Sequence, residues 1–155
     1  MRKSAFPILA FLLIAACGEK KESHEAGEQK EQGEELTAFQ LENGIGPVKE
    51  KVEVGPIDPA LAAKGKALFV AKCSMCHKMD TTYVGPSLGE VTARRTPTYI
   101  MNMILNPQEM VERHPIAKKL LAERMTLMAN QQLTVEEARA VVEYLRTQSK
   151  PAAKP

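Results

Sequence analysis

The chain has 155 residues, three of them cysteines, and a formal net charge of +2. This length suits one small globular domain with terminal segments, and the near balance of charge gives no reason to expect a nucleic-acid partner. The charge is unevenly placed. Residues 18–53 hold ten acidic and five basic side chains, a net of −5, whereas residues 54–150 hold nine acidic and thirteen basic ones, a net of +4.

The first residues resemble a bacterial export signal. Two basic residues precede an apolar stretch over residues 5–16, which suits a signal peptide and is too short to span a membrane. The stretch runs into LIAAC at residues 13–17, which resembles the lipobox of bacterial lipoproteins. We therefore expect residues 1–16 to be removed and Cys17 to carry a lipid anchor. The alternative is an ordinary secreted protein in which Cys17 has no such role.

Residues 17–55 are expected to form a lipid-anchored, flexible, acidic tether. Residues 18–43 are rich in Glu, Lys, Gln and Gly and have few apolar side chains, so they cannot bury enough surface to offset their conformational entropy. The GIGP sequence at 44–47 predicts a hinge. Residues 48–54 alternate loosely between apolar and charged side chains, so we expect them to lie extended over the globular domain.

The globular domain is expected over residues 56–150, followed by a short disordered tail at 151–155. No run of residues in it indicates a β-strand. Cap residues and prolines mark helix starts at Asp58-Pro59, Thr96-Pro97, Pro115 and Thr134-x-x-Glu137. The sequence therefore predicts an all-α domain.

Cys73-Ser74-Met75-Cys76-His77 forms a C-x-x-C-H motif, the attachment signature of a c-type haem. Two cysteines at this spacing can each form a thioether bond to a haem vinyl group, and His77 can then bind the iron. A redox dithiol and half of a zinc site are the alternatives for the two cysteines. Cys17 is the only other cysteine and no βαβ pattern surrounds the motif, so we expect one covalently bound haem c.

Residues 58–148 resemble a single-haem bacterial cytochrome c of the class I type, with histidine–methionine iron ligation. Besides C-x-x-C-H, the motifs that carry this resemblance are Gly65-x-x-x-Phe69, Gly85-Pro86-Ser87-Leu88, Ile104-x-Asn106-Pro107, Thr126-Leu127-Met128 and Glu143-Tyr144-Leu145. The resemblance implies the cytochrome c fold, in which several helices surround one haem. It also implies a hydrogen bond from His77 to the Pro86 carbonyl and a close approach of the first and last helices at Gly65.

The resemblance further implies Met128 as the sixth iron ligand, because this residue lies in the loop before the last helix. The family usually has a proline directly after this methionine, whereas this chain has Ala129. Met125 therefore stays open as an alternative, and His114 is a third candidate. Met103 lies on the apolar stripe of its helix, where a methionine more often fills a core.

Four polar residues that follow the Gly-Pro loop could contact the haem propionates, namely Arg94, Arg95, Tyr99 and Asn102. The alternative is that they only contribute surface charge.

Filled axial positions leave iron no vacancy for oxygen or peroxide, so we expect an electron carrier and not an enzyme. With the lipoprotein signal, this predicts a monomer anchored by lipid in the bacterial cell envelope and facing the periplasm. It would accept electrons from a quinol-oxidising complex and pass them to a terminal oxidase or reductase. The segment at 44–48 resembles one found in cytochromes linked with nitrous oxide reductase. A haem-based gas sensor and a small haem peroxidase are the alternative functions.

Overall fold

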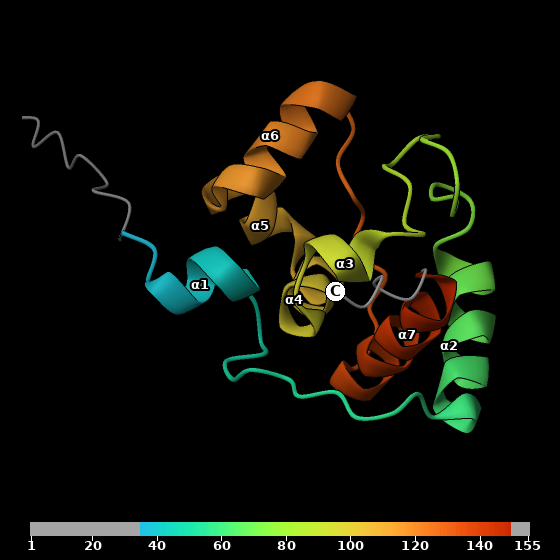
Figure 1. Ribbon diagram of the computed structural model, residues 1–155. Helices are drawn as coiled ribbons and strands as arrows, with labels where there is room; N and C mark the ends of the chain where they lie inside the picture. Colours follow the sequence, from blue (N-terminus) through green and yellow to red (C-terminus); the bar gives the residue numbers. More distant parts are fainter. Residues whose placement is uncertain (1–34, 150–155) are drawn as a thin grey trace, which may run out of the picture. The chain divides into compact units, whose positions relative to one another are not determined.

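The computed structural model describes residues 35–149 (Figure 1). The expected signal peptide, Cys17 and the tail at 151–155 lie outside these residues. Within residues 35–149 the chain forms seven α-helices and no β-strand, which confirms the predicted all-α class. They are α1 (Ala38–Asn43), α2 (Pro59–Lys72), α3 (Val91–Arg94), α4 (Pro97–Leu105), α5 (Pro107–Arg113), α6 (Pro115–Arg124) and α7 (Val135–Gln148). None of these is long and apolar enough to cross a membrane.

The longer helices begin where the cap residues predict. Asp58 accepts hydrogen bonds from two backbone N–H groups at the start of α2, and Thr134 forms a capping box with Glu137 at the start of α7. Helices α4, α5 and α6 each have a proline in the first turn, where a missing N–H costs no hydrogen bond. The helix starts predicted from the sequence do not include Pro107, which begins α5, or Val91, which begins α3.

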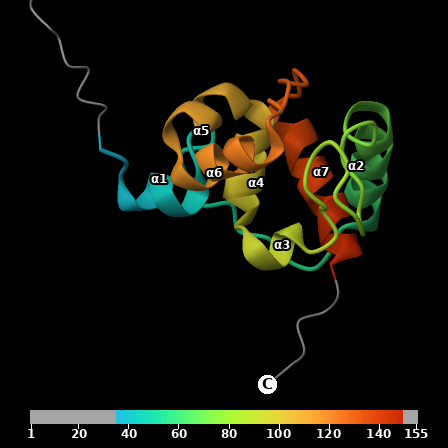
Figure 2. The same cartoon turned by 90° about the horizontal axis from the view of Figure 1, so that it is seen from above.

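Helices α2 and α7 pack against each other, side by side in both views (Figures 1 and 2). They come closest at Gly65, where a Cβ atom would collide with the backbone carbonyl of Ala140. The rings of Phe69 and Tyr144 lie across this crossing with centroids 5.4 Å apart. The contact between the first and last helices of the domain that the resemblance implies is therefore present.

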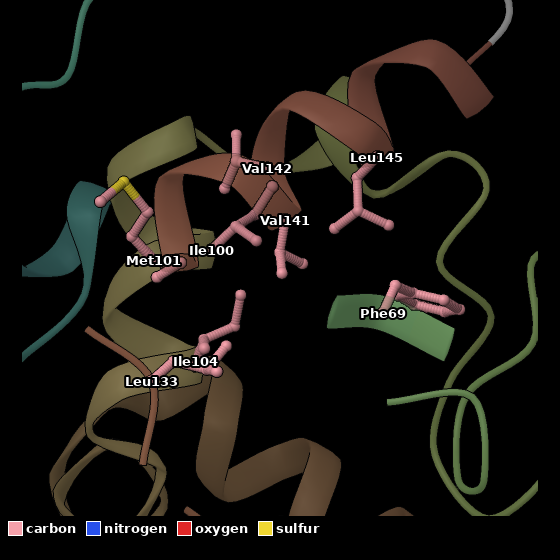
Figure 3. Close-up of a cluster of buried hydrophobic side chains, with 9 residues drawn as sticks. Phe69, Ile100, Met101, Ile104, Leu133, Val141, Val142 and Leu145 are labelled. Carbon is pink, nitrogen blue, oxygen red and sulfur yellow. The ribbon is translucent and has the colours of Figure 1, made fainter. Parts of the chain in front are cut away.

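A cluster of buried side chains joins α2, α4 and α7 (Figure 3). Its largest members are Phe69, Ile100, Met101, Ile104, Leu133, Val141, Val142 and Leu145. Full burial of one such side chain contributes about 1.5–3 kcal/mol. Figure 3 shows Val141 and Leu145 of α7 facing Phe69 of α2, with Ile104 of α4 below them. This cluster forms the inner wall of the cavity described below.

The segment at 36–55, here called the N-terminal strap, differs from the prediction of a free tether. It begins with α1, capped by Thr37, and continues as an extended chain past α4 and α7 to the start of α2 (Figure 1). Asn43 and Ile45 are 1% and 3% exposed. The tether prediction is thus wrong for residues 36–55, because the few apolar and amide side chains there find specific partners on the domain.

Asn102 of α4 is the main partner of the strap. Its amide oxygen accepts from the Val48 N–H at 3.0 Å, and its amide nitrogen donates to the carbonyls of Asn43 and Val48, both at 3.0 Å. Val52 N–H donates to Thr98 Oγ1 at 2.8 Å. These bonds satisfy backbone groups that would otherwise be buried without partners, which explains how an extended segment can lie against a helix. Residues 48–54 do lie over the domain, as their pattern predicts.

Candidate functional site

The end of α2 brings the three chemical groups of the C-x-x-C-H motif together. Cys73 caps the helix, and the backbone N–H groups of Cys76 and His77 both donate to the Cys73 carbonyl, at 3.1 and 2.9 Å. This tight turn places both thiols and the imidazole on the wall of one cavity. Neither Cys73 nor Cys76 takes part in a disulfide, so both sulfur atoms are available for thioether bonds. Burial raises the pKa of the Cys73 thiol, an effect that the nearby Lys72 ammonium partly offsets.

The His77 ring is held in a defined orientation by the loop after the motif. Its Nδ1 donates a hydrogen bond of 3.0 Å to the Pro86 carbonyl, since a carbonyl oxygen can only accept. Gly85 N–H donates to the Cys76 carbonyl at 2.9 Å, and a Cβ atom at Gly85 would collide with the imidazole. Nε2 is therefore the ring nitrogen left to bind a metal, and the hydrogen bond that the resemblance implies is present.

The cavity has a volume of about 340 Å³, and each of the helices α2 to α7 contributes to its wall. Apolar side chains dominate it, including Phe69, Ile100, Ile104, Leu120, Val141 and Leu145. We call it the central cavity. A space with apolar walls, two thiols and one imidazole nitrogen at its edge suits a flat hydrophobic group attached through sulfur and bound through nitrogen.

Two methionines line the central cavity, Met103 and Met128. Met128 is half-buried in the non-helical loop between α6 and α7 and packs against the cluster of Figure 3. Met125 is 84% exposed and does not line the cavity. Of the two methionines that the sequence leaves open as ligands, the structure therefore brings only Met128 to the site.

Three of the four predicted propionate contacts reach the central cavity, namely Arg94, Arg95 and Tyr99. The Tyr99 hydroxyl is buried without a hydrogen-bond partner, and burial raises its pKa, an effect that Arg95 partly offsets. Asn102 does not line the cavity. Its amide holds the strap instead, which contradicts the predicted propionate contact.

The structure also places His114 away from the position that an iron ligand would need. It is fully buried, neither exposed nor on the wall of the central cavity. Its Nε2 donates to the Leu41 carbonyl at 3.1 Å, and its Nδ1 accepts from the Ile116 N–H at 3.2 Å. Both nitrogens are thus occupied by the strap and by the start of α6, so His114 is not available as an iron ligand.

One cavity residue has no signal in the sequence. Arg124, the last residue of α6, lines the central cavity, and its Nε is buried without a hydrogen-bond partner. No motif surrounds it, and only the fold brings it to the site. Within residues 35–149 no group of three or more His, Cys, Asp and Glu side chains is placed to hold a metal ion, so the zinc alternative gains no support there.

The comparisons with known proteins agree with this geometry. The family model described as Cytochrome c matches residues 62–149. Cytochrome c-551 of Stutzerimonas stutzeri is 54% identical over 24% of this chain and 38% of its own length. A cytochrome c-553-like protein of a Synechocystis species is 34% identical over 33% of this chain and 61% of its own length. The chain thus covers less than two thirds of each of these relatives.

A solved structure matches more of the chain. The cytochrome c from Rhodothermus marinus is 48% identical, with a TM-score of 0.67, over 70% of this chain and 94% of that one. The similarity therefore extends over almost the whole of that protein.

Proposed function

The chain belongs to the cytochrome c family and binds covalently attached haem c, and we propose that it is a lipid-anchored periplasmic electron carrier with His77 and Met128 as iron ligands. Haem supplies a one-electron couple of ferrous and ferric iron. Redox proteins are accordingly its partners. The protein's part is to hold the group rigidly, exclude water and set its potential.

The single observation that carries the proposal is the composition of the central cavity wall. His77, oriented by Pro86, and Met128, in a packed loop, both line this one apolar space. With the His77 imidazole and the Met128 thioether as ligands, the iron would favour the ferrous state and would have no position free for an exogenous ligand. Rigid ligands also keep structural change between the two oxidation states small, as fast electron exchange requires. Cys76 is exposed, so the edge of a haem attached through it would lie near solvent.

The position of His114 weighs against the peroxidase alternative. A peroxidase needs an acid–base side chain beside the iron, and His114, the histidine considered for this role, is buried outside the cavity. The segment at 44–48 suggests nitrous oxide reductase as acceptor, but its buried residues are explained by packing on Asn102 and Met110. We therefore limit the proposal to a quinol-oxidising complex as donor and a terminal oxidase or reductase as acceptor.

The ferrous absorption spectrum with and without carbon monoxide tests the proposal. We expect an unchanged low-spin spectrum, because both axial positions are filled by protein side chains. Ready binding of carbon monoxide would favour the gas-sensor alternative. In parallel, Cys73→Ala or Cys76→Ala should shift the pyridine haemochrome band, since each removes one thioether bond.

The lipid anchor rests on the sequence of residues 13–17, outside the described residues. Its test is Cys17→Ser, which should move the protein from the membrane fraction to the soluble periplasmic fraction with an unchanged haem spectrum. Continued membrane attachment in high salt would contradict acylation at Cys17.

A further inference from the structure

The side chain of Arg124 lies on the wall of the central cavity, where we place the haem. Arg124 ends α6, because Met125 adopts a left-handed conformation with φ 53° and its N–H returns to the Leu121 carbonyl at 2.8 Å. The Arg124 carbonyl accepts from Thr126 Oγ1 at 3.2 Å. The backbone is thus fixed on both sides of Arg124. Its half-buried side chain lines the central cavity beside Leu120 and Leu121 of the same helix.

The guanidinium of Arg124 has no anion to pair with among the described residues. No ion pair joins it to a carboxylate within residues 35–149, and its Nε is buried without a hydrogen-bond partner. The nearby Glu123 is paired with Lys119. Of the guanidinium nitrogens, Nε is the one buried without a partner, and a buried donor left unpaired costs free energy. An anion on the cavity side of Arg124 would accept from this N–H and match the positive charge of the guanidinium.

The residues that line the central cavity do not supply this anion, because no Asp or Glu of residues 35–149 is among them. A second donor is in the same situation, since the Tyr99 hydroxyl is also buried without a partner on this cavity. Haem brings two carboxylates, its propionates, into an otherwise apolar space. Arg124 and Tyr99 therefore join Arg94 and Arg95 on the cavity wall as donors for these two carboxylates.

We propose that Arg124 donates hydrogen bonds to a haem propionate and so raises the reduction potential of the protein. This rests on the proposed function, because it needs a haem in the central cavity. An ionised propionate favours ferric iron, which carries one more positive charge than ferrous iron. A guanidinium in contact with the propionate cancels much of that negative charge and keeps the propionate ionised at neutral and mildly acidic pH.

The test compares Arg124→Gln with Arg124→Lys by redox titration of the purified holoprotein at several pH values. A matched control is Lys118→Gln, which removes one positive charge from the exposed face of α6, away from the cavity. We expect the equilibrium constant for reduction at neutral pH to fall about tenfold in Arg124→Gln. It should recover in part in Arg124→Lys and stay unchanged in Lys118→Gln.

The pH profile separates a contact with a carboxylate from a general effect of charge. Without Arg124 the propionate should take up a proton in the range studied, so the potential of Arg124→Gln should fall as pH rises, whereas that of the wild type stays flat. A uniform shift with a flat profile would overturn the contact, as would a titration identical to that of Lys118→Gln. Loss of the sulfur-to-iron charge-transfer band would assign Arg124 to holding the Met128 loop and also overturn the proposal. A retained band and covalent haem would leave the electron-carrier function intact in each case.

Discussion

Two methionines three residues apart lie in different surroundings. Met125 follows the last residue of α6 in a left-handed conformation that turns the chain, and its side chain is 84% exposed. Met128, which lies three residues further along the loop, lines the central cavity. The turn at Met125 therefore sets the direction in which the next residues meet the haem site.

Met128→Ala is expected to abolish the weak sulfur-to-iron charge-transfer band of the oxidised protein and to lower its potential, because a soft thioether ligand is lost. Met125→Ala should keep the band, since that side chain lies in solvent. Met103→Ala is a stricter control, because Met103 also lines the cavity but lies on helix α4. Visible spectra of the three oxidised variants decide the assignment. A band lost from Met103→Ala and kept in Met128→Ala would reverse it.

His114 should make stability depend on pH. Its burial lowers its pKa, and this effect exceeds the opposing one of its hydrogen bond to Leu41. The unfolded chain, with an ordinary histidine pKa of about 6.5, then takes up a proton before the folded chain does. The stabilising contribution is complete above about pH 6.5 and is lost as pH falls toward the lower folded pKa.

Denaturant unfolding of the oxidised holoprotein between about pH 7.5 and 5.5 measures this effect. As the pH falls, the free energy of unfolding should decrease in the wild type and decrease less in His114→Gln. A loss of stability in His114→Gln that is the same at every pH does not affect this comparison. Parallel pH slopes for the two proteins would show that His114 does not titrate between the folded and unfolded states.

At the scale of helices, cap residues predict the long elements well and long-range packing decides the rest. Asp58 and Thr134 mark helix starts because a cap bonds to its own helix, within three residues. The six-residue α1 also has a local signal, the capping box of Thr37 and Gln40. The residues around it in the sequence are mostly polar, so the composition of the segment indicates a flexible tether instead. What holds the strap is Asn102, 54 residues beyond Val48, and no local pattern shows that contact.

The residues of the site also fall into two groups, those whose positions follow from the local sequence and those whose positions depend on long-range packing. The motif residues and Pro86 are local in sequence, so their grouping follows from a tight turn and a short loop. Arg124 and the role of Asn102 depend on which faces of α6 and α4 are turned inward, and the packing of the whole domain determines that.

The crossing of α2 and α7 offers a direct test at this scale. Gly65→Ala places a methyl group against the Ala140 carbonyl, so the two helices must separate. We expect a loss of about 2 kcal/mol in the free energy of unfolding, typical of an overpacked core. Gly55→Ala is the matched control, because a Cβ there meets nothing within 4 Å. Equal stabilities of the two variants in denaturant unfolding would contradict the close approach.

At the scale of the whole molecule, the strap changes the charge of the packed unit. Residues 54–149 hold nine acidic and twelve basic side chains, a net of +3, and adding residues 35–53, with four acidic and two basic ones, lowers the net charge to +1. The cationic excess is local instead. Lys72, Arg94, Arg95 and Arg124 line the central cavity, and none of the acidic side chains of residues 35–149 does, so these four positive charges still outnumber the two haem propionates. Local charge at the point of electron exchange, more than net charge, steers a partner into contact.

Electron transfer to an anion should therefore slow as salt rises, despite a net charge near zero. With ferricyanide as oxidant of the reduced protein, we expect the second-order rate to fall about tenfold from low to high ionic strength, because salt screens the attraction. Combining Lys72→Gln with Arg94→Gln should flatten this dependence, whereas Lys118→Gln, whose charge lies outside the cavity wall, should keep it. A cationic cobalt complex should show the opposite slope with the wild type, because the same local charge repels it. If the rate with ferricyanide were independent of salt, or if Lys118→Gln flattened it equally, the charge around the cavity would not be what steers encounter.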